Sequence, residues 1–384
     1  MQPILQPVVF CGHPPTARAA PVHWPRMERP AWHTDDFPEL RDGPPWVMQE
    51  MIEAQPGLLE EIASAVDTAP LALLARVPGA LTVVGCGTSE HAALAVAEIL
   101  SDAGTDARSR QAFEAALAPQ EGGGVIGISH EGGTWATVEA LEAARRAGSA
   151  TGLITAVADS RATAEADGVV VTPLVDRSWC HTVGYTSPIA AGLALAARPP
   201  AGVVGELAAA GVERREPAAA VAAELAGCSH LIVVGSGADR IAARELTLKI
   251  EEASHIPTAM RDLETFLHGH LPACDEHTGL ILIEHDRRRG GPRHERGETL
   301  LRAAARVGVR SAVIGRTAPD PALAPAGHVA TPADDRLPAA AEALLATAPA
   351  LQWLALELAV ARGVNPDLIR REQEPYREAA ALHG

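Results

Sequence analysis

The sequence predicts an α/β protein made of two consecutive three-layer αβα domains, each built on a doubly wound parallel sheet. Short apolar segments suited to strands alternate with helical segments of about 10–15 residues, the pattern of parallel sheets with right-handed crossovers. The pattern occurs twice, and both copies open alike, with VVGCG at Val83–Gly87 and VVGSG at Val233–Gly237. The length of 384 residues suits two such domains and an arm.

Breaks in this pattern predict the domain boundaries. Residues 1–45 are rich in Pro, His and Arg without periodicity, which indicates an irregular arm. The first domain covers residues 46–200 and begins with one or two lead-in helices. The second covers residues 201–364 and follows a segment rich in proline and glycine, Arg198–Val203. Residues 365–384 form a charged tail.

Apolar runs and helical spacing predict the elements of each domain. In the first domain the expected strands are Leu81–Gly85, Gly124–Ile128, Ala150–Thr155 and Val169–Thr172, and the helices are Glu90–Leu100, Thr134–Ala147 and Ser187–Ala197. In the second the strands are Leu231–Val234, Leu280–Glu284 and Ser311–Ile314, and the helices are 203–226, Asp239–Ser254, Glu298–Val307 and Pro338–Arg362.

Composition excludes several classes of partner. The formal net charge of −16 repels phosphate backbones and anionic lipids, so we expect neither nucleic acid nor a membrane as partner. We expect no apolar run long enough to span a bilayer and no signal peptide. Five scattered cysteines without a Cys-x-x-Cys pair indicate reduced thiols and a cytoplasmic location. The histidines lack metal-ligand spacing, so no metal or cofactor is expected.

One residue stands out by its type. Lys249 is the only lysine among 32 basic residues. Chance retention is one interpretation. The other is that this position needs a compact ammonium where a planar guanidinium would not serve.

Glycine-containing turns after the predicted strands indicate where a ligand could bind. Each domain opens with a strand, a Gly-x-Gly turn and a helix, an arrangement that lets a ligand approach free backbone N–H groups. A second turn, Ser129-His130-Glu131-Gly132-Gly133-Thr134, joins a strand to a helix. Its hydroxyls suit a phosphate cradle, but simple helix capping by Ser129 or Thr134 explains them equally well.

These turns, together with a later helix, resemble a known family. GCGTS at Gly85–Ser89, the Ser129–Thr134 loop, LKIEEASHI at Leu248–Ile256 and LHG at Leu267–Gly269 are similar to the isomerase half of glucosamine-6-phosphate synthase and related tandem sugar-isomerase (SIS) proteins. The resemblance covers about residues 46–370. It implies two tandem SIS-type domains of the flavodoxin-like kind.

The resemblance also implies roles for particular residues. Glu252 matches the carboxylate that moves a proton between C1 and C2 of a sugar, and Lys249 matches a lysine one turn earlier. His268 matches a histidine that helps to open the sugar ring and reaches into the neighbouring subunit, which implies a homodimer. The residues expected to bind the sugar are Gly87, Thr88, Ser89, Ser129, His130, Glu131, Thr134, Thr186 and Ser187.

Helical spacing supports part of this assignment. Lys249 and Glu252 are three residues apart and therefore share a helix face. An ammonium beside a carboxylate favours its ionised form and can stabilise an enediolate oxygen. An ordinary surface pair on a helix remains the alternative.

The sequence departs from the family pattern at three places. Glu131 replaces a central serine of the phosphate loop, so either Glu131 turns away or the ligand carries no phosphate there. Tyr185-Thr186-Ser187 replaces a Ser-Thr-Lys stretch, and Glu374 stands where an active-site lysine is expected.

Two functions are therefore open. The first is an aldose–ketose or amino-sugar isomerase that acts on a small sugar or sugar derivative with Glu252, Lys249 and His268, without a cofactor. The second is a catalytically idle sugar-binding or regulatory protein on the same fold.

Overall fold

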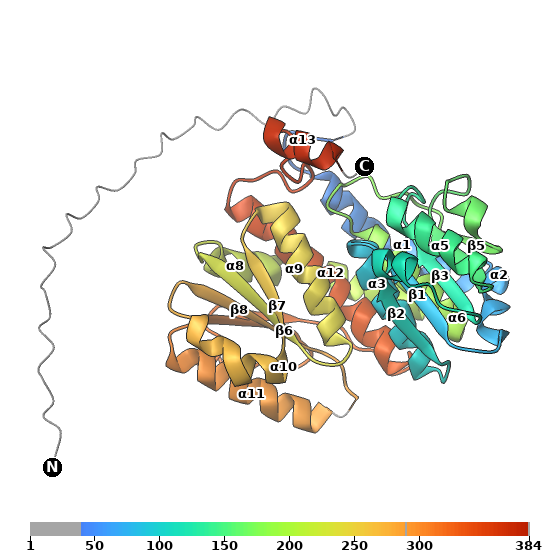
Figure 1. The fold of residues 1–384 in the computed structure, drawn as a ribbon. Coiled ribbons are helices and arrows are strands. Elements are labelled where there is room, and N and C mark those ends of the chain that lie inside the picture. Colours follow the sequence, from blue (N-terminus) through green and yellow to red (C-terminus); the bar gives the residue numbers. More distant parts are fainter. Residues whose placement is uncertain (1–39, 289, 383–384) are drawn as a thin grey trace, which may run out of the picture.

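The computed structural model describes residues 40–288 and 290–382 and contains two parallel five-stranded sheets with helices on both faces (Figure 1). The first sheet has the order β2-β1-β3-β4-β5 and the second the order β10-β9-β8-β6-β7. Read from its other edge, the second sheet repeats the first strand by strand. The predicted fold class is confirmed.

The strands of the first sheet are β1 (Leu81–Gly85), β2 (Ala107–Gln111), β3 (Gly124–Ile128), β4 (Ala150–Thr155) and β5 (Gly168–Val171). Those of the second are β6 (His230–Gly235), β7 (Thr258–Asp262), β8 (Thr278–Glu284), β9 (Arg310–Gly315) and β10 (Gly327–Ala330). The sequence analysis missed β2, β7 and β10. All three are edge strands, and β2 (ARSRQ) and β7 (TAMRD) are largely polar, so the apolar pattern of a central strand is missing.

The longer helices are α1 (Val47–Ala65), α3 (Thr88–Asp102), α5 (Trp135–Arg146), α6 (Val183–Ala196), α7 (Val203–Val212), α8 (Arg215–Leu225), α9 (Asp239–Ser254), α11 (Gly290–Arg306) and α12 (Ala339–Ala361). The shorter ones are α2 (Ala69–Ala72), α4 (Ala112–Leu117), α10 (Leu263–Thr265) and α13 (Glu374–Ala381). Of the predicted arm, residues 1–39 lie outside the described residues.

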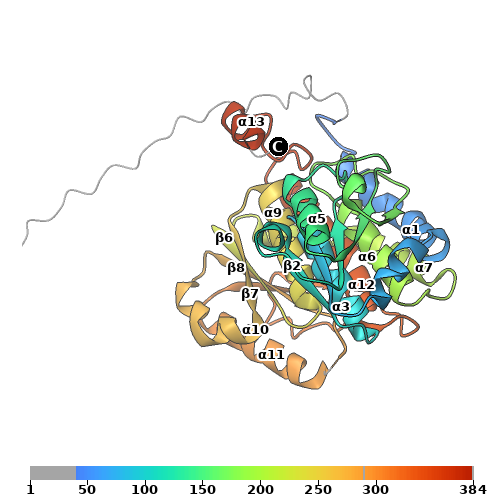
Figure 2. The same ribbon diagram turned by 45° about the vertical axis from the view of Figure 1, so that its right-hand side comes forward.

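The two halves share helices. α7, which follows the predicted boundary in sequence, packs against α1 at the start of the first half (Figure 2). α12 contributes Leu344 and Leu345 to the core beside the first sheet, and Leu354 and Leu358 to the core beside the second. One helix therefore joins both hydrophobic cores.

α12 also corrects an expectation about membranes. The sequence analysis expected no apolar run of membrane length, yet α12 is long and apolar enough to cross a bilayer by length and composition. In the structure 94% of its most apolar window is buried. This burial is typical of a core helix of a globular protein.

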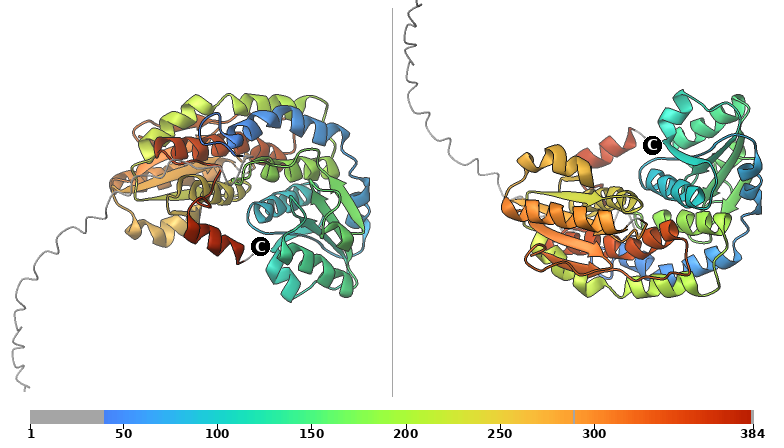
Figure 3. Two further views of the ribbon diagram at one scale, coloured as in Figure 1. Left: turned by 90° about the horizontal axis from the view of Figure 1, so that it is seen from above. Right: turned by 90° about the horizontal axis from the view of Figure 1, so that it is seen from below.

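The first part of the C-terminal segment is buried against the start of the fold. Asp367 accepts hydrogen bonds from the N–H groups of Val47 and Met48, both at 2.8 Å, and thereby caps α1. It also accepts one from the hydroxyl of Ser178 at 2.7 Å. α13 then continues to the face where the two halves meet (Figure 3).

Candidate functional site

A buried ion pair on α9 lies between the two halves. Lys249 is completely buried, and its ammonium donates a hydrogen bond to Glu252 Oε2. Its Nζ atom is also 3.8 Å from Glu245 Oε1. Burial opposes the charge of Lys249, but the nearby carboxylates of Glu252 and Glu245 outweigh it, so the pKa of the ammonium is raised. Lys249 is therefore a fixed cation behind Glu252.

Glu252 reaches from this pair to a cavity. Its side chain is 24% exposed and lines a cavity of about 460 Å³ between the end of α9 and the C-terminal segment. The lining residues are Glu251, Glu252, His255, Ile256, Pro257, Ile369, Arg370 and Tyr376. A cavity of this size is in the range that holds a small ligand.

Backbone strain is concentrated around the same cavity. Among the described residues, the non-glycine residues with positive φ are His255 at 59°, Ile369 at 42° and Arg370 at 64°. All three line the cavity. Such conformations are costly, above all for a β-branched residue, and they tend to cluster at ligand sites. No sequence signal marks these residues in advance.

The Ser129–Thr134 loop lies at the carboxyl end of β3. Ser129 and His130 are buried, and Ser129 Oγ is 3.4 Å from Thr134 Oγ1. Thr134 is the N-cap of α5 but makes no side-chain capping hydrogen bond, so this structure gives no support to its capping role. Glu131 is exposed. Of the two alternatives that the sequence leaves open, this exposure agrees with the one in which Glu131 turns away from the loop.

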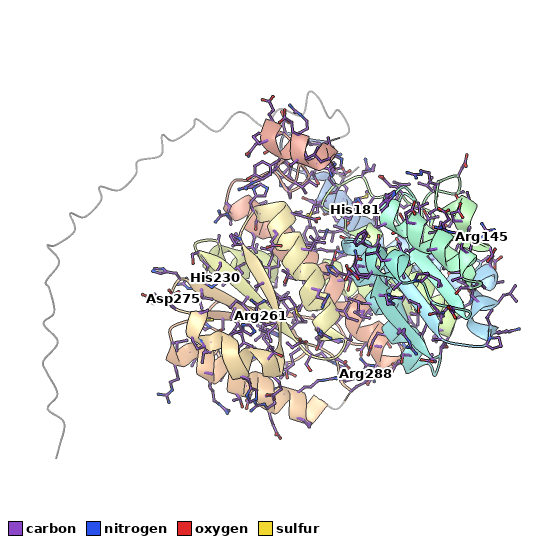
Figure 4. All side chains as sticks on the ribbon, viewed as in Figure 1. Arg145, His181, His230, Arg261, Asp275 and Arg288 are labelled. Carbon is purple, nitrogen blue, oxygen red and sulfur yellow. The ribbon has the colours of Figure 1, made fainter. Side chains whose placement is uncertain are left out.

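His130 is held in the neutral form. Its Nε2 atom accepts a hydrogen bond of 2.7 Å from the N–H of Asp176, and its ring lies 5.3 Å from the ring of His181. Burial, followed by the neighbouring His181, lowers the pKa of His130 to about 4. Figure 4 shows His181 where the two halves of the molecule approach each other.

The first Gly-x-Gly turn faces α9 across a second cavity. Gly85 must be glycine, because a Cβ atom there would lie 2.3 Å from the carbonyl oxygen of Ser89. Gly87 has φ 56° and precedes α3; Thr88 is buried and Ser89 is half-buried. Gly87 lines a cavity of about 360 Å³ with His91, Arg244, Thr247, Leu248, Glu251 and Met260. The sequence analysis did not single out His91.

Of the predicted site residues, Gly87 and Glu252 line these two cavities, whereas Thr186, Ser187 and His268 belong to other parts of the fold. Thr186 and Ser187 are completely buried inside α6, where Thr186 Oγ1 donates to the carbonyl of Thr182 at 3.4 Å. His268 is 80% exposed and follows α10 in the chain, whereas Glu252 lies in the last turn of α9. In Figure 1 α10 lies at the end of the second half opposite α13, which contributes Tyr376 to the cavity of Glu252. One chain does not bring His268 to Glu252. Glu374 is exposed at the start of α13.

Comparison of the sequence with models of known protein families identifies one matching segment. The SIS domain matches residues 224–291, a segment that contains Lys249, Glu252 and His268. This segment of the chain is similar to the SIS domain. Sequence comparison with curated proteins gives no match. The Ser129–Thr134 loop lies outside the matched segment, so its relation to the SIS family depends on the fold.

Solved structures share that fold across most of this chain. The C-terminal domain of glucosamine-fructose-6-phosphate aminotransferase from Francisella tularensis is 18% identical with a TM-score of 0.73, covering 85% of this chain and 99% of that one. Tagatose-6-phosphate ketose/aldose isomerase from Escherichia coli is 18% identical with a TM-score of 0.70, covering 84% and 95%. Glucosamine-6-phosphate deaminase from Thermotoga maritima is 18% identical with a TM-score of 0.65, covering 84% and 97%.

Proposed function

We propose that this protein is a sugar isomerase of the SIS family, or an enzyme that interconverts a sugar and its amino derivative, with Glu252 as the proton-transfer base. The observation that carries this proposal is the pair formed by Glu252 and Lys249. The only lysine of the chain is buried behind the one carboxylate that it contacts at hydrogen-bond distance, and that carboxylate opens to a cavity. The names of the structural neighbours support a sugar as substrate.

The proposed reaction is a proton transfer between neighbouring carbons. The carboxylate of Glu252 takes a proton from the carbon beside the sugar carbonyl, and the electron pair moves onto the carbonyl oxygen to give an enediolate. The protonated carboxyl then returns the proton to the adjacent carbon, while the proton of the neighbouring hydroxyl passes to the oxygen of the former carbonyl and the new carbonyl forms. Lys249 holds Glu252 in place and adds a fixed positive charge near the developing anion. It acts as a positioning residue because its own side chain is buried.

The test is exchange of a carbon-bound proton of the sugar with solvent deuterium, followed by NMR. The substrates are fructose, glucose and glucosamine, each with and without a 6-phosphate. Glu252→Gln should lower the exchange rate about 10²–10⁴-fold and leave sugar binding nearly unchanged. Glu61→Gln, at an exposed glutamate of α1, is the matched control. Exchange by Glu252→Gln at the wild-type rate would remove Glu252 from the mechanism.

A second function has an observation in its favour. Glu374 stands, exposed, where the family resemblance expects an active-site lysine. A sugar-binding or regulatory protein without catalysis would tolerate this change. Binding of a sugar by the wild-type protein, with no proton exchange for any of the six substrates, would favour this second function.

A homodimer in the cytoplasm belongs to the same proposal. His268 is exposed and remote from Glu252 within one chain, so only a second copy could place it at the site. The unpaired cysteines among the described residues, Cys86, Cys180, Cys228 and Cys274, agree with a reducing compartment. A monomer at micromolar concentration in sedimentation equilibrium would exclude a shared site.

A further inference from the structure

A histidine–glutamate pair links the two halves at the cavity beside Gly87. His91 lies in the first turn of α3 and Glu245 in the middle of α9. Their Nδ1 and Oε2 atoms are 2.7 Å apart. The side chain of His91 is 13% exposed and that of Glu245 is completely buried. A carboxylate such as that of Glu245 is fully buried only when it has polar partners. The contact with His91 is therefore a structural part of the folded protein.

The surroundings of Glu245 fix the orientation of His91. The second carboxylate oxygen, Oε1, has no hydrogen-bond partner among the described residues and lies 3.8 Å from Lys249 Nζ. An ionised carboxylate can only accept, so Nδ1 of His91 carries the hydrogen. The Nε2 atom is then the acceptor. A carboxylate behind an imidazole also stabilises the imidazolium when the ring takes up a second proton.

His91 shares its cavity with a predicted sugar-binding residue. Gly87 and His91 both line the cavity of about 360 Å³ between α3 and α9. Glu251 lines this cavity and also the cavity of Glu252. The two cavities therefore adjoin along α9. The polar side chains of His91, Glu245, Lys249 and Glu252 form a continuous series of contacts from one cavity to the other.

We infer that His91 is a further catalytic residue, which opens the sugar ring within a single chain with Glu245 as its positioning carboxylate. This inference rests on the proposed isomerase function. The Nε2 atom takes the proton of the anomeric hydroxyl, and the carbonyl forms as the bond from the anomeric carbon to the ring oxygen breaks. The imidazolium then gives that proton to the ring oxygen. His91 ends as it began, and no other reactant is needed.

The test compares a ring-forming ketose with one that cannot form a ring. Fructose 6-phosphate is cyclic in solution, whereas 5-deoxyfructose 6-phosphate lacks the hydroxyl that closes the ring. Exchange of the C1 protons with solvent deuterium is measured by NMR for both. His91→Gln keeps an N–H donor for Glu245 but cannot transfer protons. It should lower exchange at least about 100-fold with the cyclic sugar and less than about 3-fold with the open-chain sugar.

One further variant separates catalysis from other effects. Glu90→Gln removes the neighbouring contact between the halves, in which Glu90 Oε1 lies 3.8 Å from Arg244 Nη1, and should leave both rates unchanged. Equal rates for wild type and His91→Gln with the cyclic sugar, or equal losses with both sugars, would overturn the inference. Absence of exchange by the wild-type protein with both sugars and with all six substrates named above would instead overturn the proposed function, and the inference with it.

Discussion

The loops that follow β3 and β8 occupy equivalent places in the two halves but differ in where their acidic side chains lie. Gly127 pairs with Val84 in the first sheet, and Leu282 pairs with Val234 in the second. Counting from these pairs, His130 corresponds to His285, and Glu131 to Asp286. Both histidines are buried, and each bonds a residue 46 positions later, Asp176 for His130 and Thr331 for His285.

In the loop after β8, carboxylates of the chain itself accept hydrogen bonds from the backbone N–H groups. We call this loop the closed cradle and the Ser129–Thr134 loop the open one. Asp286 accepts a hydrogen bond from the N–H of Ala238 at the start of α9, and Asp239 accepts from the N–H groups of His285 and Asp286. Arg288 and Arg293 lie against Asp286. These backbone groups would otherwise bind an external anion. A cavity of about 160 Å³ remains there.

In the first half Glu131 is exposed, and Ser89 stands at the position that corresponds to Asp239. The first loop therefore lacks both carboxylates that occupy the second. Two positions make this difference, Glu131 against Asp286 and Ser89 against Asp239. The comparison can be tested by opening the closed cradle, by titrating each loop and by removing the acid from the open one.

Opening the closed cradle should have the largest effect. Asp286→Ala leaves the Ala238 N–H without its acceptor and removes the carboxylate that Arg288 and Arg293 share, so we expect a loss of about 3–5 kcal/mol in unfolding free energy. Added phosphate should restore part of it by binding the vacated position. Urea unfolding with and without phosphate measures both. A variant that does not respond to phosphate would show that this cradle holds no anion.

Asp239 should make the second half less stable as the pH rises. Burial raises its pKa to about 7, although N–H donors oppose the rise. Its unfolded pKa is about 3.9, so between pH 4 and 7 the folded state binds more protons and stability falls with increasing pH. Asp239→Asn should remove this trend and gain about 2–4 kcal/mol relative to wild type between pH 4 and 8. Urea unfolding gives the free energy of unfolding of wild type and of Asp239→Asn as a function of pH. If the two curves run parallel between pH 4 and 8, the raised pKa does not belong to Asp239.

His130 should act in the opposite direction in the first half. Its pKa of about 4 in the folded state lies below the unfolded value of about 6.5, so its stabilising effect is present above pH 6.5 and is lost as the pH falls toward 4. Protonation of Nε2 also breaks the bond from the Asp176 N–H. As the pH falls from 6.5 to 4, the His130→Gln variant should therefore lose about 1–3 kcal/mol less unfolding free energy than the wild type. Thermal unfolding at pH 4, 5.5 and 7 measures it, with His230→Gln as the control.

Removing the acid from the open loop should have the smallest effect. Glu131 is exposed, so solvent and salt screen its repulsion of a bound phosphate. Glu131→Ser should therefore raise the affinity for fructose 6-phosphate less than about 3-fold in calorimetric titration. A rise of tenfold or more would mean that the carboxylate turns into the cradle when the ligand binds.

The sequence by itself determined the alternating αβ pattern, its duplication and the pairing of Lys249 with Glu252. These features are local: strand and helix periods, a repeated VVGxG opening and a spacing of three residues on one helix are all readable within short windows. Edge strands such as β2 were not predicted, because they bury little apolar surface and their sequences lack the apolar pattern of a central strand.

Only the tertiary structure decided which side chains meet. His91 and Glu245 are 154 positions apart, and nothing in either neighbourhood encodes their contact. The exposure of Glu131, the burial of Thr186 and Ser187 and the remoteness of His268 likewise depend on how α3, α6 and α9 pack together. Such contacts arise when distant segments bury apolar surface jointly, and the energy of that burial is shared across the whole core rather than carried by any one motif.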